Sequence, residues 1–236
     1  AAMGAKPVAY TLSIALPSIQ TEWLSQFAKG LHQIADLHGC ELIGGDTTAG
    51  PLTISITAIG SVPPSQALRR DSAQIGDDIW VSNTVGDARL VLGFRRGEWH
   101  LELPWEDIAD RMDAPTPRVN LGLGLRGIAQ SAIDISDGLL GDLNHILEAS
   151  KVSANIWVDD VPCSPLLREV SLELRRLCTL KGGDDYELCF TASKEHRSRI
   201  EQLGKSLDIP LHRIGEITAP VKNQKRLKLF DADHLP

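Results

Sequence analysis

The sequence has no paired cysteines. Its four cysteines, Cys40, Cys163, Cys178 and Cys189, are scattered, and no two of them form a CxxC pair. This spacing argues against a structural zinc site and against a disulfide framework. Free thiols are typical of a reducing compartment, so we expect a cytoplasmic location.

Positive charge is in the minority, with 24 Lys and Arg against 31 Asp and Glu and a net charge of -7. A nucleic-acid-binding protein usually carries a basic stripe, which this composition does not favour. Long apolar runs are missing as well, because none approaches the roughly 18 residues of a membrane span. No signal-peptide pattern is visible. We therefore expect no nucleic acid and no membrane among the partners.

Two common phosphate-binding fingerprints are also missing. The chain contains neither a GxxxxGK[ST] loop nor a GxGxxG turn. No histidine stands at a spacing typical of a nucleophile's base or of a metal ligand, so we assign no catalytic side chain. Any phosphate chemistry must rest on other residues.

At 236 residues the chain fits one large or two modest domains, with a second unit starting near Gly76. Apolar periodicity predicts strand, helix, strand, strand in the first third and an alternation of strands and helices afterwards, which is typical of α/β or α+β folds. The expected strands are 10–16, 41–43, 52–58, 78–82, 131–135, 154–158, 186–191, 213–217 and 226–230. The expected helices lie near 23–34, 86–96, 119–128 and 138–150.

Three segments place glycine and aspartate directly after an apolar run: IGGDTTAGP at 43–51, AIDISDG at 132–138 and KGGDDYELCF at 181–190. Glycine lets a bulky ligand approach the backbone, and aspartate at a strand end offers hard oxygen ligands to a divalent cation. Three such strand ends indicate a site for a polyanion held through magnesium.

Each segment also has a purely structural interpretation. The glycines before Asp46 suit a turn between two strands. Asp137 suits the N-cap of the following helix, although this leaves Asp134, in an apolar strand, unexplained. Asp184 and Asp185 suit a solvated turn. Arg69 and Arg70 offer planar forks for phosphate, or else form an exposed linker pair.

Taken together, these stretches resemble the thiamine-monophosphate kinases of the aminoimidazole ribonucleotide synthetase superfamily. The resemblance rests on motifs that follow one another in the family's order: AAMGAKP at 1–7, IGGDTTAGPLTI at 43–54, ALRRDSAQIGDDIWVSNTVGD at 67–87, PTPR at 115–118, SAIDISDGLLGDLNHIL at 131–147 and GGDDYELCF at 182–190. It implies an α+β, two-domain synthetase-like fold. Residues 1–68 would form a partial, barrel-forming N-terminal domain for ATP, magnesium and dimerisation. Residues 77–236 would form a C-terminal mixed-sheet domain with helices on one face.

The resemblance implies ATP-dependent phosphorylation of thiamine monophosphate to thiamine diphosphate, with Mg²⁺ required and a homodimer as the working unit. Carried over by position, the ATP-binding residues are Gly45, Asp46, Arg70 and Ser136. The magnesium ligands are Asp46, Asp134 and Asp137, and the substrate contact is Asp184. An ATP-dependent synthetase of the same superfamily and a catalytically silent nucleotide-binding or assembly protein are the alternatives.

The chain departs from the family pattern at several positions. Asp184 replaces a usual glutamate, which shortens the carboxylate's reach by one methylene. Ala49 replaces a usual arginine, and Asp71-Ser72 replaces a usual Ser-Gly. The family's segment of several dozen residues before AAMGA and its tryptophan near the carboxyl end are not matched. We therefore expect the first domain to expose apolar surface and a sheet edge.

Overall fold

The structure is a computed structural model that describes residues 1–100, 102–221 and 225–231. The chain divides into two compact units, one formed by Ala5–Pro64 and the other by Ala1–Gly4 together with the residues from Ser65 onward. No helix in these described ranges is long and apolar enough to cross a membrane. Each unit is described by itself below.

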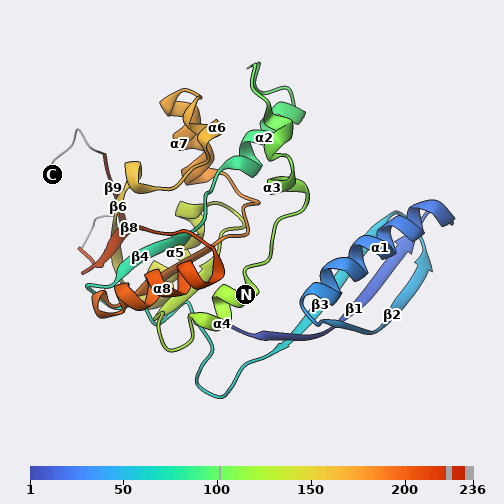
Figure 1. Cartoon of the computed structure of the whole chain (residues 1–236), viewed down its shortest axis with the longest axis horizontal. Helices are drawn as coiled ribbons and strands as arrows, with labels where there is room; N and C mark the ends of the chain where they lie inside the picture. The colour runs from blue at the N-terminus through green and yellow to red at the C-terminus, as the bar shows by residue number, and fades with distance from the viewer. Residues whose placement is uncertain (101, 222–224, 232–236) are drawn as a thin grey trace. The chain divides into compact units, whose positions relative to one another are not determined.

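The smaller unit is a three-stranded sheet with one helix. Its elements are β1 (Lys6–Leu16), α1 (Thr21–Leu37), β2 (Glu41–Ala49) and β3 (Thr53–Ser61), so the predicted order of strand, helix, strand, strand is confirmed. The central strand β1 pairs in parallel with β2 and antiparallel with β3. Figure 1 shows α1 lying along one face of this sheet.

The two faces of this sheet differ in polarity. Because successive side chains of a strand point to opposite faces, directly paired residues share a face. Tyr10 and Ile14 are buried and pair with Ala58 and Ile54 on the apolar face. The next residues along β1, Thr11 and Ser13, belong to the opposite, hydroxyl-rich face.

The first glycine-aspartate segment is not the strand end that the sequence analysis expected. Gly44, Gly45 and Asp46 lie inside β2, which runs on to Ala49. The register with β1 shifts at Ile43, and a Cβ on Gly45 would stand 1.8 Å from the carbonyl oxygen of Leu12. Glycine is needed here because two backbones approach closely at a bulge, so the alternative interpretation of these glycines as a turn between two strands is wrong.

The larger unit contains a six-stranded mixed sheet in the order β5-β7-β4-β8-β6-β9. All neighbours are antiparallel except β6 and β9, which run in parallel. The α+β class and the mixed sheet are therefore confirmed. The strands are β4 (Asp78–Ser82), β5 (Ser131–Asp134), β6 (Ser153–Trp157), β7 (Leu188–Ala192), β8 (Leu211–Thr218) and β9 (Leu227–Phe230).

Helices cover both faces of this sheet, whereas the sequence analysis expected them on one face only (Figure 1). Alternate strand residues pack into separate clusters, because the buried strands are apolar on both sides. Val81 packs with Leu143 of α5, while Trp80 packs with Leu121 of α4 and Ile200 of α8. The helices are α2 (Asp87–Arg95), α3 (Asp110–Asp113), α4 (Val119–Gly124), α5 (Leu139–Ser150), α6 (Pro165–Arg168), α7 (Leu172–Lys181) and α8 (Arg197–Leu207), with short 3₁₀ turns η1 (Trp105–Ile108), η2 (Val158–Asp160) and η3 (Lys194–His196).

Several polar loops lie together at one edge of the six-stranded sheet, where its strands begin or end. Strands β4 and β5 are both antiparallel to β7, which lies between them. The carboxyl ends of β4 and β5 therefore meet the amino end of β7 at the same edge. The second and third glycine-aspartate segments both lie at this edge.

Candidate functional site

The loop after β5 is held by a buried carboxylate that lies four residues beyond the end of the loop, in α5. Asp142 in the first turn of α5 accepts the backbone N–H groups of Ser136, Asp137 and Gly138, each at 3.0 Å from its Oδ2 atom. Asp134 closes the strand and is half-buried, while the side chain of Asp137 is exposed. Asp142 thus fixes the backbone that carries the predicted magnesium ligands.

This arrangement decides against one structural alternative. The N-cap residue of α5 is Gly138, and no side chain caps that end. Asp137 is therefore not the N-cap, because Gly138 occupies that position and the Asp137 side chain accepts no N–H group of the first helical turn. Burial raises the pKa of Asp142, while its three N–H donors act in the opposite direction.

Asp142 is not among the residues predicted from the sequence, although the sequence pattern around it indicates a structural role. Leu139, Asp142, Leu143 and Ile146 recur at spacings of three and four residues, and all four are buried. A carboxylate on the apolar stripe of a helix is expensive unless its oxygens accept hydrogen bonds. Its position alone therefore predicts local backbone donors.

The third segment is interlocked with the second. The N–H of Asp184 donates to the carbonyl oxygen of Ser136 at 2.9 Å, and the N–H of Tyr186 donates to that of Ile135 at 2.8 Å. A Cβ on Gly183 would stand 2.4 Å from the Ser136 oxygen. Both Asp184 and Tyr186 adopt positive φ angles, 66° and 51°, a conformation that costs free energy for non-glycine residues. The two loops form one rigid unit.

The Tyr186 hydroxyl at this junction is hydrogen-bonded to one carboxylate, that of Asp184, and lies 3.3 Å from its Oδ1 atom. Burial raises the pKa of Tyr186, and the negative charges of Asp184, Asp134 and Asp137 raise it further. The structure thus brings together four of the predicted site residues, namely Asp134, Ser136, Asp137 and Asp184.

A second buried carboxylate ties the third segment to the end of β4. Glu187 is 1% exposed and accepts from Arg118 at 2.7 and 2.6 Å and from Arg111 at 3.1 Å. It also accepts from the Ser82 hydroxyl at 2.5 Å and from the Asn83 amide at 3.1 Å. A carboxylate that accepts from this many donors holds the surrounding segments in place.

Asp185 is buried as well, so the solvated-turn interpretation is wrong for this residue. Both of its oxygens accept the N–H of Gly86, at 2.9 Å. Burial raises the pKa of Asp185 well above its usual range, and the nearby charges of Asp87 and Glu187 add to this. The sequence analysis missed Asp185 and Glu187, although two acids at alternate positions entering an apolar strand are a usable signal.

The Arg69–Asp71 segment runs beside β5. The carbonyl oxygen of Arg69 accepts from Ala132 N at 3.2 Å, and its guanidinium pairs with Asp71 at 2.8 and 2.5 Å. The side chain of Arg70 is exposed and makes no hydrogen bond or ion pair within the described ranges, while its carbonyl oxygen accepts from the Ser150 hydroxyl. Of the two arginines, only Arg70 keeps its charge uncompensated.

Gly45 and Asp46 lie in the smaller unit. Asp46 is exposed and pairs with Ser13 of β1, which in turn pairs with Ser55 of β3. These three residues therefore form a row across the hydroxyl-rich face of the sheet. A carboxylate beside two hydroxyl groups is suited to bind a cation.

The donor set fits magnesium only in combination with other ligands. In the described part of the chain, no group of three or more His, Cys, Asp or Glu side chains is arranged to hold a metal ion. Mg²⁺ commonly takes one or two protein carboxylates and completes its shell with water and substrate phosphates. Asp134 and Asp137 are oxygen ligands of this kind, so the residues present fit a magnesium ion that arrives with a phosphate ligand.

Comparisons with known proteins point to one family. Residues 1–62 match the family described as AIR synthase related protein, N-terminal domain. The thiamine-monophosphate kinase of Haemophilus influenzae is 41% identical over 219 residues, which cover 92% of this chain and 67% of that protein. The kinase of Escherichia coli strain K12 is 38% identical over 232 residues, covering 94% of this chain and 69% of that protein.

Solved structures agree with the sequence comparisons. The crystal structure of thiamine-monophosphate kinase from Stenotrophomonas maltophilia K279a superposes with a TM-score of 0.90 at 47% identity, covering 97% of this chain and 73% of that one. The structure of AaThiL complexed with AMPPCP and TMP gives a TM-score of 0.82 at 26% identity, covering 97% and 71%. The chain thus spans roughly seven tenths of each of these relatives.

Proposed function

Because the chain belongs to the thiamine-monophosphate kinase family, we propose that it transfers the γ-phosphate of ATP to thiamine monophosphate and releases thiamine diphosphate and ADP. Within this chain, the observation that supports this function is the interlocked pair of loops formed by the second and third glycine-aspartate segments. Backbone hydrogen bonds join these loops, which carry Asp134, Asp137 and Asp184, at the polar edge of the sheet. Such a cluster needs cations as partners, and a phosphoryl-transfer site supplies them as metal–nucleotide complexes.

Magnesium is part of this proposal. Asp134 and Asp137 of the larger unit would be magnesium ligands, and so, in its own unit, would Asp46. When bound, Mg²⁺ would neutralise phosphate oxygens and offset the repulsion between the donor and acceptor phosphates.

The other roles follow from position and charge. Arg70, with its uncompensated guanidinium, would bind ATP phosphates, and Gly45 would let the nucleotide approach the backbone beside Asp46. Ser136 would contact the nucleotide from the loop that Asp142 holds. Asp184 would contact the thiamine substrate, with a shorter reach than the usual glutamate.

No general base is required for the proposed direct, in-line transfer. The acceptor is a phosphate oxygen that is already ionised near neutral pH, so the site need only position two phosphates and compensate their charge. This requirement suits a site built from carboxylates, backbone groups and an arginine.

We also propose a homodimer formed through the smaller unit, with residues 1–68 contributing to nucleotide binding and to the dimer interface. Strands β2 and β3 are the edges of their sheet and expose apolar side chains, including Leu42, Ile43, Ile54 and Ile56. Exposed edges with apolar faces favour pairing with another chain. Sedimentation equilibrium should give twice the chain mass. The free thiols, three of them buried, support a cytoplasmic location.

A substrate panel tests the proposed activity against the alternatives. The intact chain is incubated with ATP, Mg²⁺ and thiamine monophosphate, and both ADP and thiamine diphosphate are measured. A synthetase of the same superfamily would release ADP only with its own amide or amine co-substrate. A silent nucleotide-binding protein would bind ATP in a calorimeter without turnover.

An Asp46→Asn variant tests the metal anchor in the smaller unit. We expect kcat to fall by about 100-fold or more, because a neutral amide is a poor ligand for magnesium and compensates no charge. Asp36→Asn, an exposed position on α1 of the same unit, is the matched control and should keep the full rate. Full activity of Asp46→Asn would remove Asp46 from the site.

A further inference from the structure

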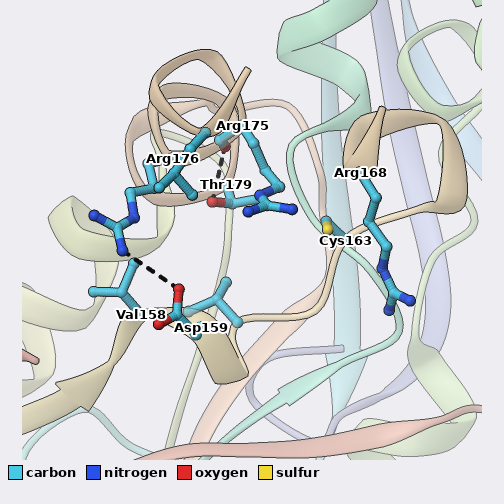
Figure 2. Close-up of a pocket in the computed structure, with 9 residues that line it drawn as sticks. Val158, Asp159, Cys163, Arg168, Arg175, Arg176 and Thr179 are labelled. Atoms are coloured by element: carbon cyan, nitrogen blue, oxygen red, sulfur yellow. Dashed lines mark hydrogen bonds and ion pairs between the residues drawn. The ribbon is translucent and has the colours of Figure 1, made fainter. Parts of the chain in front are cut away.

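One pocket in the larger unit is lined by arginines. It has a volume of about 330 Å³ and lies between η2, α6 and α7 (Figure 2). Arg168 comes from α6, and Arg175 and Arg176 come from α7. Its size falls within the range of small-molecule sites.

This pocket adjoins a different strand from the one that carries Asp134. Its wall at Val158 and Asp159 directly follows β6, whereas Asp134 ends β5. The two strands are four positions apart in the sheet, which is about 19 Å at the usual strand spacing. The pocket and the proposed phosphoryl-transfer site are therefore built on different strands, although α7, which lines the pocket, leads into the third glycine-aspartate segment.

The positive charges in this pocket are only partly compensated. Arg176 pairs with Asp159 at 3.4 Å and with Asp231 at 3.3 Å. By contrast, neither Arg168 nor Arg175 forms an ion pair with an acidic residue in the ranges that the structure describes. Two guanidinium groups on different helices thus face one cavity without a carboxylate partner.

Neighbouring groups respond to this charge. The pKa of His212 is lowered, first by burial and then by the positive charge of Arg168. The pocket also contains a buried thiol, Cys163, and the Thr179 hydroxyl, which donates to the Arg175 carbonyl oxygen at 3.0 Å. A concave site with uncompensated guanidinium groups attracts anions.

We propose that this pocket binds a small oxyanion that carries two or more negative charges, with the guanidinium groups of Arg168 and Arg175 as its ligands. Guanidinium groups bind phosphate and carboxylate oxygens through paired, charge-assisted hydrogen bonds. A ligand with at least two charges satisfies both helices at once. The cationic ring of thiamine does not fit this chemistry.

Calorimetric titration with inorganic pyrophosphate tests the proposal. The titration uses the intact chain after passage over a chelating resin, with neither magnesium nor a soluble chelator present, so the carboxylate cluster repels the probe and does not contribute. We expect saturable binding of one pyrophosphate per chain that weakens as sodium chloride is added. The measurement uses neither ATP nor thiamine monophosphate, so its failure would leave the proposed kinase activity untouched.

Three variants locate the binding. Arg175→Gln and Arg168→Gln should each weaken pyrophosphate binding by about tenfold or more, because each removes a charged donor. Arg199→Gln, at an exposed position of α8, should bind as the unchanged chain does. Arg168 is itself exposed, so its variant should keep the melting temperature even if Arg175→Gln does not. Absence of saturable binding, or equal affinity in all three variants, overturns the proposal.

Discussion

The guanidinium of Arg118 donates to both oxygens of Glu187, at 2.7 and 2.6 Å, while the Glu187 side chain is almost completely buried. This pair links the segment before α4 to the amino end of β7, where the third glycine-aspartate segment enters the sheet. The same carboxylate accepts from Arg111. The geometry of the candidate site therefore depends on this ion cluster. In the described part of the chain, no side chain of the cluster contacts the side chain of a predicted magnesium or substrate ligand.

Glu187→Gln should be strongly destabilising. It leaves the partly buried Arg118 and Arg111 without this compensating charge, and loss of one partner of a buried pair costs up to about 3–5 kcal/mol of unfolding free energy. Urea denaturation of the variant measures this loss. Glu195→Gln, at an exposed position, is the control and should change the free energy of unfolding little. Equal stability of the two variants would show that the cluster does not hold the fold.

Asp142→Ala should impair the site more than the fold. It leaves three backbone N–H groups without their acceptor, which costs about 1–3 kcal/mol of stability where such groups stay buried. The freed loop should also raise the magnesium concentration needed for half-maximal activity. Asp142→Asn keeps one acceptor oxygen, so its magnesium requirement should fall between those of the unchanged chain and Asp142→Ala. An unchanged magnesium dependence in Asp142→Ala would limit this residue to a structural role.

Gly183→Ala should separate the interlocked loops. Its methyl group would overlap the Ser136 carbonyl oxygen, and relief of such overpacking commonly costs about 1–3 kcal/mol. Gly141→Ala provides the matched control, because no atom lies within 4 Å of a Cβ there and alanine favours the helix by up to about 1 kcal/mol. Thermal melting and kcat should both fall for the first variant only. Similar behaviour of the two would contradict the interlocked arrangement.

Asp185 should make stability depend on pH. Its folded pKa is raised well above the unfolded value by burial, so its favourable contribution is complete below the unfolded pKa. The contribution is lost as the pH rises from near 4 through the folded pKa. Asp185→Asn cannot ionise, so the free energy of unfolding of the variant minus that of the unchanged chain should increase across this window. A difference that stays constant or decreases would contradict the raised pKa.

Periodicity was sufficient to predict most of the fold. The alternation of Leu52, Ile54 and Ile56 with polar residues predicted β3, and the five residues from Asp78 to Ser82 form β4 as expected. The turn composition of Gly44-Gly45-Asp46 was misleading, because glycine is required there by the close approach of the neighbouring strand. Local sequence does not reveal which strand passes nearby.

The candidate site was predictable in part for a similar physical reason. Asp134 and Asp137 stand out because carboxylates near an apolar strand need partners. Asp142 and Glu187 act through donors that only the folded backbone and distant side chains supply, from as far as 105 residues away in sequence. Helices on both sheet faces were also missed, since a buried strand is apolar in both directions and does not indicate which helix covers which side.

The most direct test of the central claim follows the γ-phosphate itself. The intact chain is given ATP labelled at the γ-phosphate together with thiamine monophosphate and Mg²⁺, and the labelled products are separated. We predict that the label appears in thiamine diphosphate, in amounts equal to the ADP formed, and that EDTA abolishes the transfer. Label that remains in ATP or appears only as inorganic phosphate would contradict the account.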